Sequence, residues 1–339
     1  LDDLNKKYIP ATPYVNVFNA SPDGGFSQYF DSPRYSTGYT TLFNTLGVMI
    51  ETHMLKSYPK RVQVTYDFLW SSLEFLIKNG KEIKLKRAIA NQEFQIKKTY
   101  PIQWEIDSTK TSKLNFKGYE ASYKKSEVTG LNRLFYDQTK PFEKEIIYYN
   151  YFKPAKEIEI PSAYIIPKGW RNVVDLLKSN HIEMLEFNKD TTLMVETYQI
   201  VDYKSRTKPY EGHFTHYQIK TKKIKREVKF SKGDYYVTTK QNGLRYLIET
   251  LEPEAPDSFF SWNFFDTILQ EKEGFSPYVF EETAKEILKS NEHLNAEFEL
   301  KKNSDESFRK NAYAQLQFIY KNSEFAENTY LIYPIYRLP

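Results

Sequence analysis

A single carboxylate, Glu51, follows the short apolar run Val48–Ile50. Three apolar residues in a row are typical of a strand that is buried on both faces. An ionised carboxylate at the exit of such a strand loses hydration, so the position is poor for stability. Strand ends in open α/β sheets line the crevice where ligands bind, so the same position suits chemistry. The structural alternative is that Glu51 pairs with a cation and only fixes its loop. The cations near it in sequence are Arg34, Lys56 and Arg61.

Histidines are the next candidates, because a catalytic zinc site takes its ligands from His, Asp, Glu or Cys. The sequence holds His53, His181, His213, His216 and His293. None of them begins a His-x-x-Glu or His-Glu-x-x-His pattern. His213 and His216 have a helix-like spacing, but they lie in a strand-rich stretch, where residues three apart point to opposite faces. This pattern favours a structural pair over a metal site, and we assign no metal ligand in this chain.

Other kinds of chemistry have little support. The chain has no cysteine, which excludes disulfides and thiolate catalysis, and it has neither a Gly-x-Ser-x-Gly elbow nor a phosphate-binding glycine loop. The basic run Lys220–Arg226 lies in an alternating strand, where lysines discourage pairing at a sheet edge. A net charge of +4 is too small to predict a nucleic-acid partner. No apolar run reaches the ~18 residues that a membrane span requires.

The elements that would position Glu51 lie in residues 1–98, which we interpret as the C-terminal part of an α/β domain. An apolar stripe at helical spacing predicts an amphipathic helix that ends at Asn79–Gly80, with a second, charged helix over Lys81–Lys97. The stripe consists of Val62, Tyr66, Leu69, Leu73, Leu76 and Ile77. One strand and one helix cannot form a stable α/β sheet. We therefore expect the other strands to lie outside this chain; its start, Leu1-Asp2-Asp3, suggests a processed chain or a piece of a longer one.

Residues 99–240 change to strand patterns, several of them strictly alternating. The clearest runs are Ile102–Ile106, Ile146–Tyr149, Ile158–Ile160 and Leu193–Ile200. One helix is expected near Trp170–Ser179. We interpret this region as a β-rich accessory domain, similar to a β-sandwich, with the helix packed at one edge.

Residues 241–339 are predicted to form a helical C-terminal region, with an N-cap at Asp305 or Ser304. Its expected helices are Leu244–Leu251, Trp262–Leu269, Ala284–Lys289 and Asp305–Tyr320. Tyr330–Tyr336 is expected to be a docked, extended tail. The predicted fold class is therefore α+β multidomain: a remnant of an α/β domain, then a β-sandwich-like domain, then helices.

Motifs at both ends of the chain carry a resemblance to a known family. They are Arg34–Thr45, Val48–Lys56, Leu251–Glu254, Asp257–Ser258 and Trp262–Asp266. The first two resemble the final catalytic segment of bacterial zinc carboxypeptidases, in the carboxypeptidase A-like metallopeptidase family. The other three are similar to the C-terminal region of large Bacteroidetes-type members. The resemblance covers almost the whole chain.

The resemblance implies roles for particular residues. In that family a His-x-x-Glu pair and a distant His hold zinc, and a Glu on a late strand is the general base. Glu51 matches the general base by its position, and Arg34 and Tyr35 fall in the loop that contacts the peptide substrate. His53 lies nearby and would only orient this loop. All three zinc ligands of the family are missing from this sequence, so zinc is expected only in the full-length enzyme.

Two functions are therefore carried forward. The first is part of a zinc metallocarboxypeptidase that is periplasmic, secreted or at the cell surface and acts on peptides. This chain alone is expected to be inactive, because a Glu without metal cannot make water a potent nucleophile near neutral pH; its upstream segment or a partner protein would supply the rest. The alternative is a non-catalytic binding or assembly subunit of a cell-surface complex, which the abundant Tyr and Phe would suit.

Overall fold

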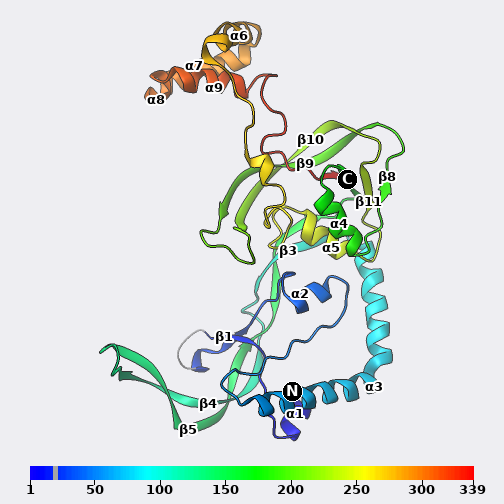
Figure 1. Ribbon diagram of the computed structural model, residues 1–339, viewed down its shortest axis with the longest axis vertical. Helices are drawn as coiled ribbons and strands as arrows, with labels where there is room; N and C mark the ends of the chain where they lie inside the picture. The colour runs from blue at the N-terminus through cyan, green and yellow to red at the C-terminus, as the bar shows by residue number, and fades with distance from the viewer. Residues whose placement is uncertain (18–21) are drawn as a thin grey trace.

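The computed structural model describes residues 1–17 and 22–339. The molecule is elongated, with a helical unit at one end, a sheet with two packed helices in the middle, and a long hairpin and a long helix at the other end (Figure 1). The described residues form helices and three separate sheets. This mixture agrees with the predicted α+β class.

The N-terminal region contributes strands to a sheet that it shares with later residues. Its elements are α1 (Asp2–Lys6), β1 (Val15–Val17), η1 (Pro22–Gly24), β2 (Phe26–Gln28) and α2 (Ser36–Thr41). The strand order is β1-β2-β5-β4, with β4 (Ser112–Lys125) and β5 (Asn132–Tyr149) forming a long projecting hairpin. Strand β2 runs parallel to β5. The sheet thus joins residues on both sides of the boundary that we placed at residue 98.

The predicted strand at Val48–Ile50 is wrong. These residues form an irregular extended segment, and Val48 is 74% exposed and Met49 59% exposed. In the described structure no neighbouring strand hydrogen-bonds to this segment. Three apolar side chains in a row predict a strand only where a partner strand is present to pair with them, and in the described part of the chain no strand pairs with these residues.

Helix α3 is a single element of 39 residues, Tyr58–Ile96. The predicted stop at Asn79–Gly80 is wrong, because the helix continues through Gly80, around which a β-carbon would meet nothing within 4 Å. Glycine weakens a helix interior by about 1 kcal/mol but does not end it. Every side chain of α3 in the described structure is at least partly exposed. The predicted apolar stripe therefore exists but is not covered.

The middle of the molecule holds the main core. Strands β3 (Thr99–Ile106) and β6 (Phe152–Glu159) form a two-stranded ribbon. The six-stranded sheet has the order β10-β9-β12-β7-β11-β8. Its strands are β7 (Ala163–Ile166), β8 (Leu185–Glu186), β9 (Thr191–Ser205), β10 (His216–Phe230), β11 (Tyr235–Thr238) and β12 (Tyr336–Leu338).

Helices, rather than a second sheet, pack on the six-stranded sheet. Helix α4 (Arg171–Ser179) and α5 (Leu244–Leu251) share a core with Tyr164 and Val237. The predicted β-sandwich is therefore wrong, although the helix that we expected near Trp170 is present. The apolar stripe of α4, which includes Val173, Val174 and Leu177, packs into this core together with α5.

The C-terminal helices form a unit with its own core. They are α6 (Pro277–Ser290), α7 (Glu292–Ser304), α8 (Glu306–Arg309) and α9 (Ala312–Lys321). The expected N-cap at Asp305 is confirmed, since its side chain accepts a hydrogen bond from the Phe308 backbone at 3.0 Å. The helix expected over Trp262–Leu269 is wrong: turns lead to a short 3-10 helix, η2 (Asp266–Leu269).

The chain then returns to the middle of the molecule. Strand β12 lies between β7 and β9, so the end of the chain docks in the sheet. Of the extended tail predicted over Tyr330–Tyr336, only Tyr336 belongs to this strand, and Leu331 lies in a turn with a φ of 57°. No helix in residues 1–17 and 22–339 is long and apolar enough to cross a membrane.

Candidate functional site

A shielded ion pair holds the segment that carries Arg34 and Tyr35. Arg34 Nε donates to Asp257 Oδ1 at 2.7 Å, and the Arg34 backbone N–H donates to Oδ2 at 2.9 Å. The guanidinium carbon lies 5.6 Å from the ring centroid of Tyr210 and 5.3 Å from that of Trp262. Arg34 therefore holds the segment that carries Tyr35 against the loop that contains Asp257. It is not among the described residues that line the cavity beside Glu51.

Close backbone packing fixes α2 directly after Tyr35. A β-carbon on Gly38 would lie 2.1 Å from the Ser32 carbonyl oxygen, so only glycine fits there. Leu42, just after α2, is buried in the main core. Arg245 on α5 donates to the Asn44 side-chain oxygen at 2.9 Å. The segment from Arg34 to Asn44 is thus docked on α5 and the loop after it.

Glu51 is exposed, and no ion pair to it is found in the described part of the chain. The structural alternative of a pair with Arg34 is not observed, because the Arg34 guanidinium is taken by Asp257. Glu51 lines a cavity of about 590 Å³, together with Tyr35, Thr37 and Met49. The structure therefore brings two of the three predicted site residues, Glu51 and Tyr35, to one cavity.

Tyrosines form much of the wall of this cavity. Tyr14, Tyr29, Tyr35 and Tyr148 all line it. The Tyr29 hydroxyl donates to the Tyr35 hydroxyl at 2.6 Å, and the two rings meet edge to face with centroids 5.5 Å apart. This hydrogen bond, with partial burial, raises the pKa of Tyr29 to about 12. Because Tyr35 accepts from Tyr29, its own hydroxyl hydrogen can be donated to a bound group.

The histidines have structural contacts. The His53 ring accepts a hydrogen bond from the Leu55 backbone at 3.2 Å, which fits the expected role in ordering its loop. His216 is buried, with Nε2 2.9 Å from Asp266 Oδ1 and Nδ1 2.9 Å from Ser205 Oγ. His213 packs against Trp262 with ring centroids 5.4 Å apart. No cluster of three potential metal ligands occurs within residues 1–17 and 22–339. The described residues do not form a zinc site.

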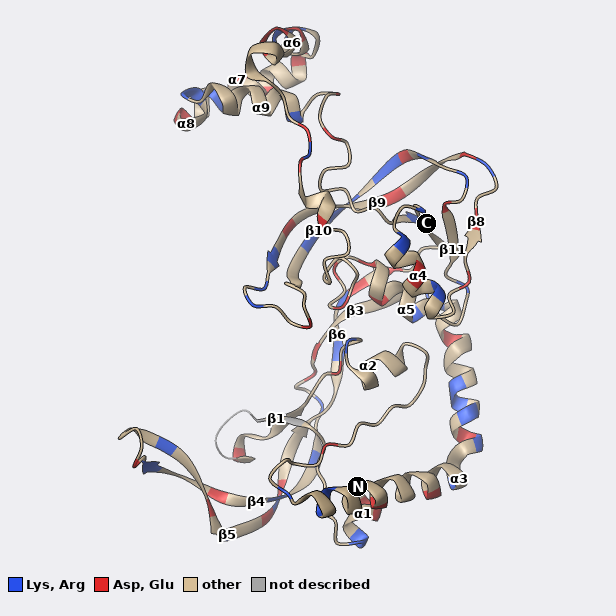
Figure 2. Cartoon of the chain, viewed as in Figure 1, with Lys and Arg blue, Asp and Glu red and all other residues tan. Residues whose placement is uncertain are grey.

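The basic run Lys220–Arg226 lies on β10, the edge strand of the six-stranded sheet. Lys220 pairs with Asp202 at 3.1 Å, and Lys223 pairs with Glu196 at 3.4 Å. Figure 2 shows Lys and Arg interleaved with Asp and Glu along β9 and β10. The basic residues are thus partly neutralised by their neighbours on the same sheet.

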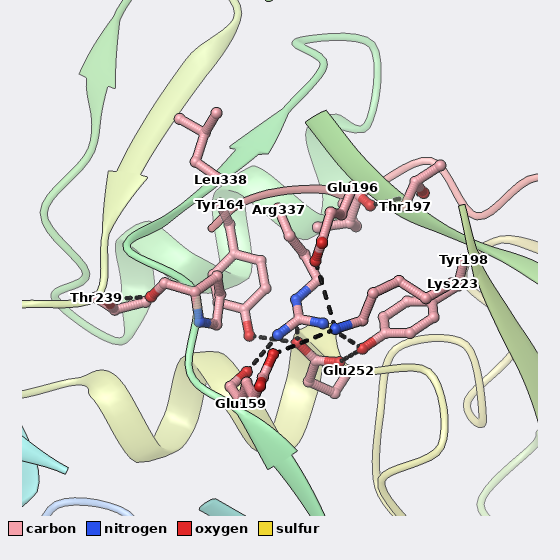
Figure 3. A network of polar contacts seen from close by, with 12 residues as sticks. Glu159, Tyr164, Glu196, Thr197, Tyr198, Lys223, Thr239, Glu252, Arg337 and Leu338 are labelled. Atoms are coloured by element: carbon pink, nitrogen blue, oxygen red, sulfur yellow. Dashed lines mark hydrogen bonds and ion pairs between the residues drawn. The ribbon is translucent and has the colours of Figure 1, made fainter. Parts of the chain in front are cut away.

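The acidic run Leu251–Ser258 becomes part of the interior, which the sequence did not reveal. Glu252 is 1% exposed and accepts hydrogen bonds from the hydroxyls of Tyr164 at 2.6 Å and Tyr198 at 2.7 Å. Arg337 Nε lies 3.2 Å from its Oε1. Figure 3 shows these side chains converging from different strands and the α5 loop. Such a buried pair is stable only when its remaining polar atoms are also bonded, as they largely are here.

Two further acids of this region serve as anchors. Glu254 Oε1 accepts from the Thr221 backbone at 2.8 Å and from its hydroxyl at 2.7 Å, and Asp257 holds Arg34. The signal that could have found them is the position of the run, directly before the apolar Phe259–Phe260 pair. Acids beside a core segment must be paired to be buried.

Comparison with known proteins finds a relation over part of the chain. Carboxypeptidase 2 of Trichophyton tonsurans and Carboxypeptidase 2 of Trichophyton equinum are each 29% identical to it over 102 residues. This is a local similarity to carboxypeptidases. The matched stretch makes up 30% of this chain and only 19% of each fungal protein. No protein-family profile matches the chain, and no solved structure matches it significantly.

Proposed function

We propose that this chain is part of a zinc metallocarboxypeptidase of the Bacteroidetes type, which removes residues from the C-terminal end of peptides. The observation that carries the proposal is the shared cavity of Glu51 and Tyr35, the residues that the resemblance assigns to base and substrate contact. The local similarity to Carboxypeptidase 2 supports the same class. The resemblance alone suggests a periplasmic, secreted or cell-surface location.

In this proposal Glu51 takes a proton from the water that attacks the scissile carbonyl. A carboxylate that borders a cavity can accept a proton from a water molecule bound there and so act as a general base. The Tyr35 hydroxyl donates to an oxygen of the peptide. Arg34 acts indirectly, because its pair with Asp257 positions the segment that carries Tyr35.

Zinc belongs to the proposal only through residues outside this chain. Bound zinc lowers the pKa of water from ~15.7 to ~7. The described residues offer no zinc site, so the ligands would lie in upstream sequence or in a partner protein. We therefore expect the 339-residue chain alone to be inactive.

Helix α3 offers a surface on which the rest of an α/β domain would pack. Leu69, Leu73 and Leu76 of its apolar stripe are each at least half exposed. A helix with one apolar side normally buries that side against another element. In the complete enzyme this side would cover a sheet.

The test is a Glu51→Gln variant of the protein extended through an upstream His-x-x-Glu. We expect kcat for release of a C-terminal residue to fall by a factor of about 10² to 10⁴, while the zinc content stays equal to that of the parent. Peptide products are measured by mass spectrometry and metal by atomic emission. Glu127→Gln, an exposed residue on the β4–β5 hairpin loop, is the matched control and should keep full activity. Full turnover by Glu51→Gln, or an extended protein without zinc, would contradict the proposal.

The alternative is a non-catalytic binding or assembly subunit. It is favoured by the exposed apolar residues of α3 and of the hairpin tip, where Val128 is 94% exposed and Leu131 is 71% exposed. Exposed apolar patches often mark interaction surfaces. Under this alternative the extended protein would not cleave peptides, and serine substitution along the α3 stripe would abolish assembly.

A further inference from the structure

A second cavity, of about 520 Å³, lies between the N-terminal segment, the β3–β6 ribbon and α5. Its volume falls within the ~300–1,000 Å³ range of small-molecule sites. Gln28, Tyr29 and Asp31 line both this cavity and the one beside Glu51, so the two are neighbours. Neither the resemblance nor the chemistry proposed for Glu51 uses the second cavity.

A buried carboxyl group, Glu249 on α5, forms part of its lining. The side chain is 6% exposed, and Oε1 accepts a hydrogen bond from the Tyr100 hydroxyl at 3.0 Å. No hydrogen bond to its other oxygen, Oε2, is found in the described part of the chain, and Oε2 is not among the fully buried unpaired atoms, so it is accessible from the cavity. A carboxyl oxygen that borders a cavity and has no protein donor can accept a hydrogen bond from a bound ligand.

The neighbouring cation, Arg245, donates its hydrogen bonds to other groups than Oε2 of Glu249. Arg245 also lines the cavity, but its Nη1 donates to Asn44 Oδ1 and its Nε lies 3.4 Å from the Tyr100 hydroxyl oxygen. Its guanidinium carbon lies 4.7 Å from the Phe94 ring centroid. Arg245 is thus held in the wall. Asp31 is a second acidic residue that lines the cavity, and its side chain is exposed.

Aromatic side chains line the same cavity as the two acids. Phe30 and Phe152 line the cavity with ring centroids 5.2 Å apart, and Trp104 lines it beside them. Aromatic faces attract cations, most strongly where water is excluded. We propose that this cavity binds an organic cation, with its ammonium group against Glu249 and its hydrocarbon part among these rings.

The binding should depend on pH because the pKa of Glu249 is raised to about 7. Burial is the main cause and the charge of Asp257 adds to it, whereas the Tyr100 hydrogen bond and the Arg245 charge act in the opposite direction. Asp257 is itself paired with Arg34. A bound cation favours the ionised carboxylate, so affinity should rise as pH increases through about 7 and then level off.

The probe is benzylamine, titrated by calorimetry into the 339-residue chain, with benzyl alcohol as the neutral counterpart. We expect benzylamine to bind roughly tenfold more tightly at about pH 8 than at about pH 6, because the ionised fraction of a group with a pKa near 7 rises by that factor. Benzyl alcohol should bind weakly at both. Equal binding of the two compounds, or no binding of benzylamine, would overturn the proposal.

Single substitutions test whether benzylamine binding depends on the residues that line this cavity. Glu249→Gln keeps an acceptor for Tyr100, and it should lose the pH dependence and at least fivefold of the affinity at the higher pH, by the loss of one charge-assisted contact of about 1 kcal/mol or more. Trp104→Leu, a partly exposed position, should also weaken binding and is the variant to use if Glu249→Gln does not fold.

Glu186→Gln, on β8, is the matched control. Glu51→Gln should bind benzylamine normally, so failure of the peptidase proposal leaves this one intact. A Glu249→Gln variant that keeps the pH dependence would refute it.

Discussion

The chemical properties of single residues in this protein depend more on their surroundings than on the residue type. Glu51 and Glu249 are both glutamates that line cavities, but Glu51 is exposed and Glu249 is buried. Glu51 is open to solvent at its cavity, whereas burial raises the pKa of Glu249 to about 7, so Glu249 holds its proton up to about that pH. The sequence could single out Glu51 through its motif. It could not single out Glu249, because burial of that residue depends on the packing of α5 against β3.

Burial of Glu249 should make the free energy of unfolding depend on pH. Its pKa is about 7 in the folded chain against a reference value of 4.5, so the folded state holds a proton that the unfolded state has lost between these values. The free energy of unfolding should therefore fall as pH rises from about 4.5 to about 7, by up to ~3 kcal/mol relative to Glu249→Gln, and stay level above that. Urea denaturation of the two proteins over this pH range measures the difference. A difference that does not change with pH would contradict the assignment.

At the scale of elements, the clearest successes are those with strong local patterns. The α4 stripe, the Asp305 cap and the long alternating strand β10 are present where the sequence predicted them. The failures are elements for which the neighbours decide the outcome. Val48–Ile50 forms no strand because no partner strand lies beside it, and α3 passes through Gly80 because a solvated helix tolerates one glycine.

Strand β12 depends on its buried arginine. Removing one partner of a buried ion pair leaves the other charge uncompensated and costs about 3–5 kcal/mol. We expect Arg337→Met to destabilise the six-stranded sheet by this amount, since Glu252 remains almost fully buried. Adding Glu252→Gln should recover part of the loss. Lys223→Met, which alters a partly exposed ion pair, should cost about 1 kcal/mol or less. Thermal unfolding followed by circular dichroism compares the variants, and an Arg337→Met protein as stable as Lys223→Met would refute the argument.

At the scale of the whole molecule, the sequence predicted three regions in order, but the structure connects them differently. Strand β2, in the first region, pairs with β5 in the second, and β12, at the far end, lies between β7 and β9. Such pairings join residues that are distant in sequence, and local patterns carry no information about them. The candidate site shows the same limit, since its segment is held by Asp257, more than two hundred residues away in the chain.

The α6–α9 unit should be removable as a block. It packs around its own core, and the two connecting segments meet where the Lys272 backbone donates to Glu327 at 3.0 Å. We expect a chain in which a short Gly/Ser linker replaces residues 274–325 to unfold within about 5 °C of the parent. Scanning calorimetry measures this. Deletion of β12, which lies inside the sheet, is the contrasting control and should abolish the transition. Loss of the transition in the linker variant would show that the helices support the sheet.

The place of β12 has a consequence for synthesis on the ribosome. Strands β7 and β9 are made early, but they remain separated by an open gap until residues 336–338 have emerged. During that interval their facing edges carry unpaired peptide groups, which are sites for wrong association. The intervening helices are translated meanwhile and can fold from local contacts. A nascent chain that stalls before β12 would therefore display finished helices beside an incomplete sheet, and this is the stage at which chaperones should be needed most.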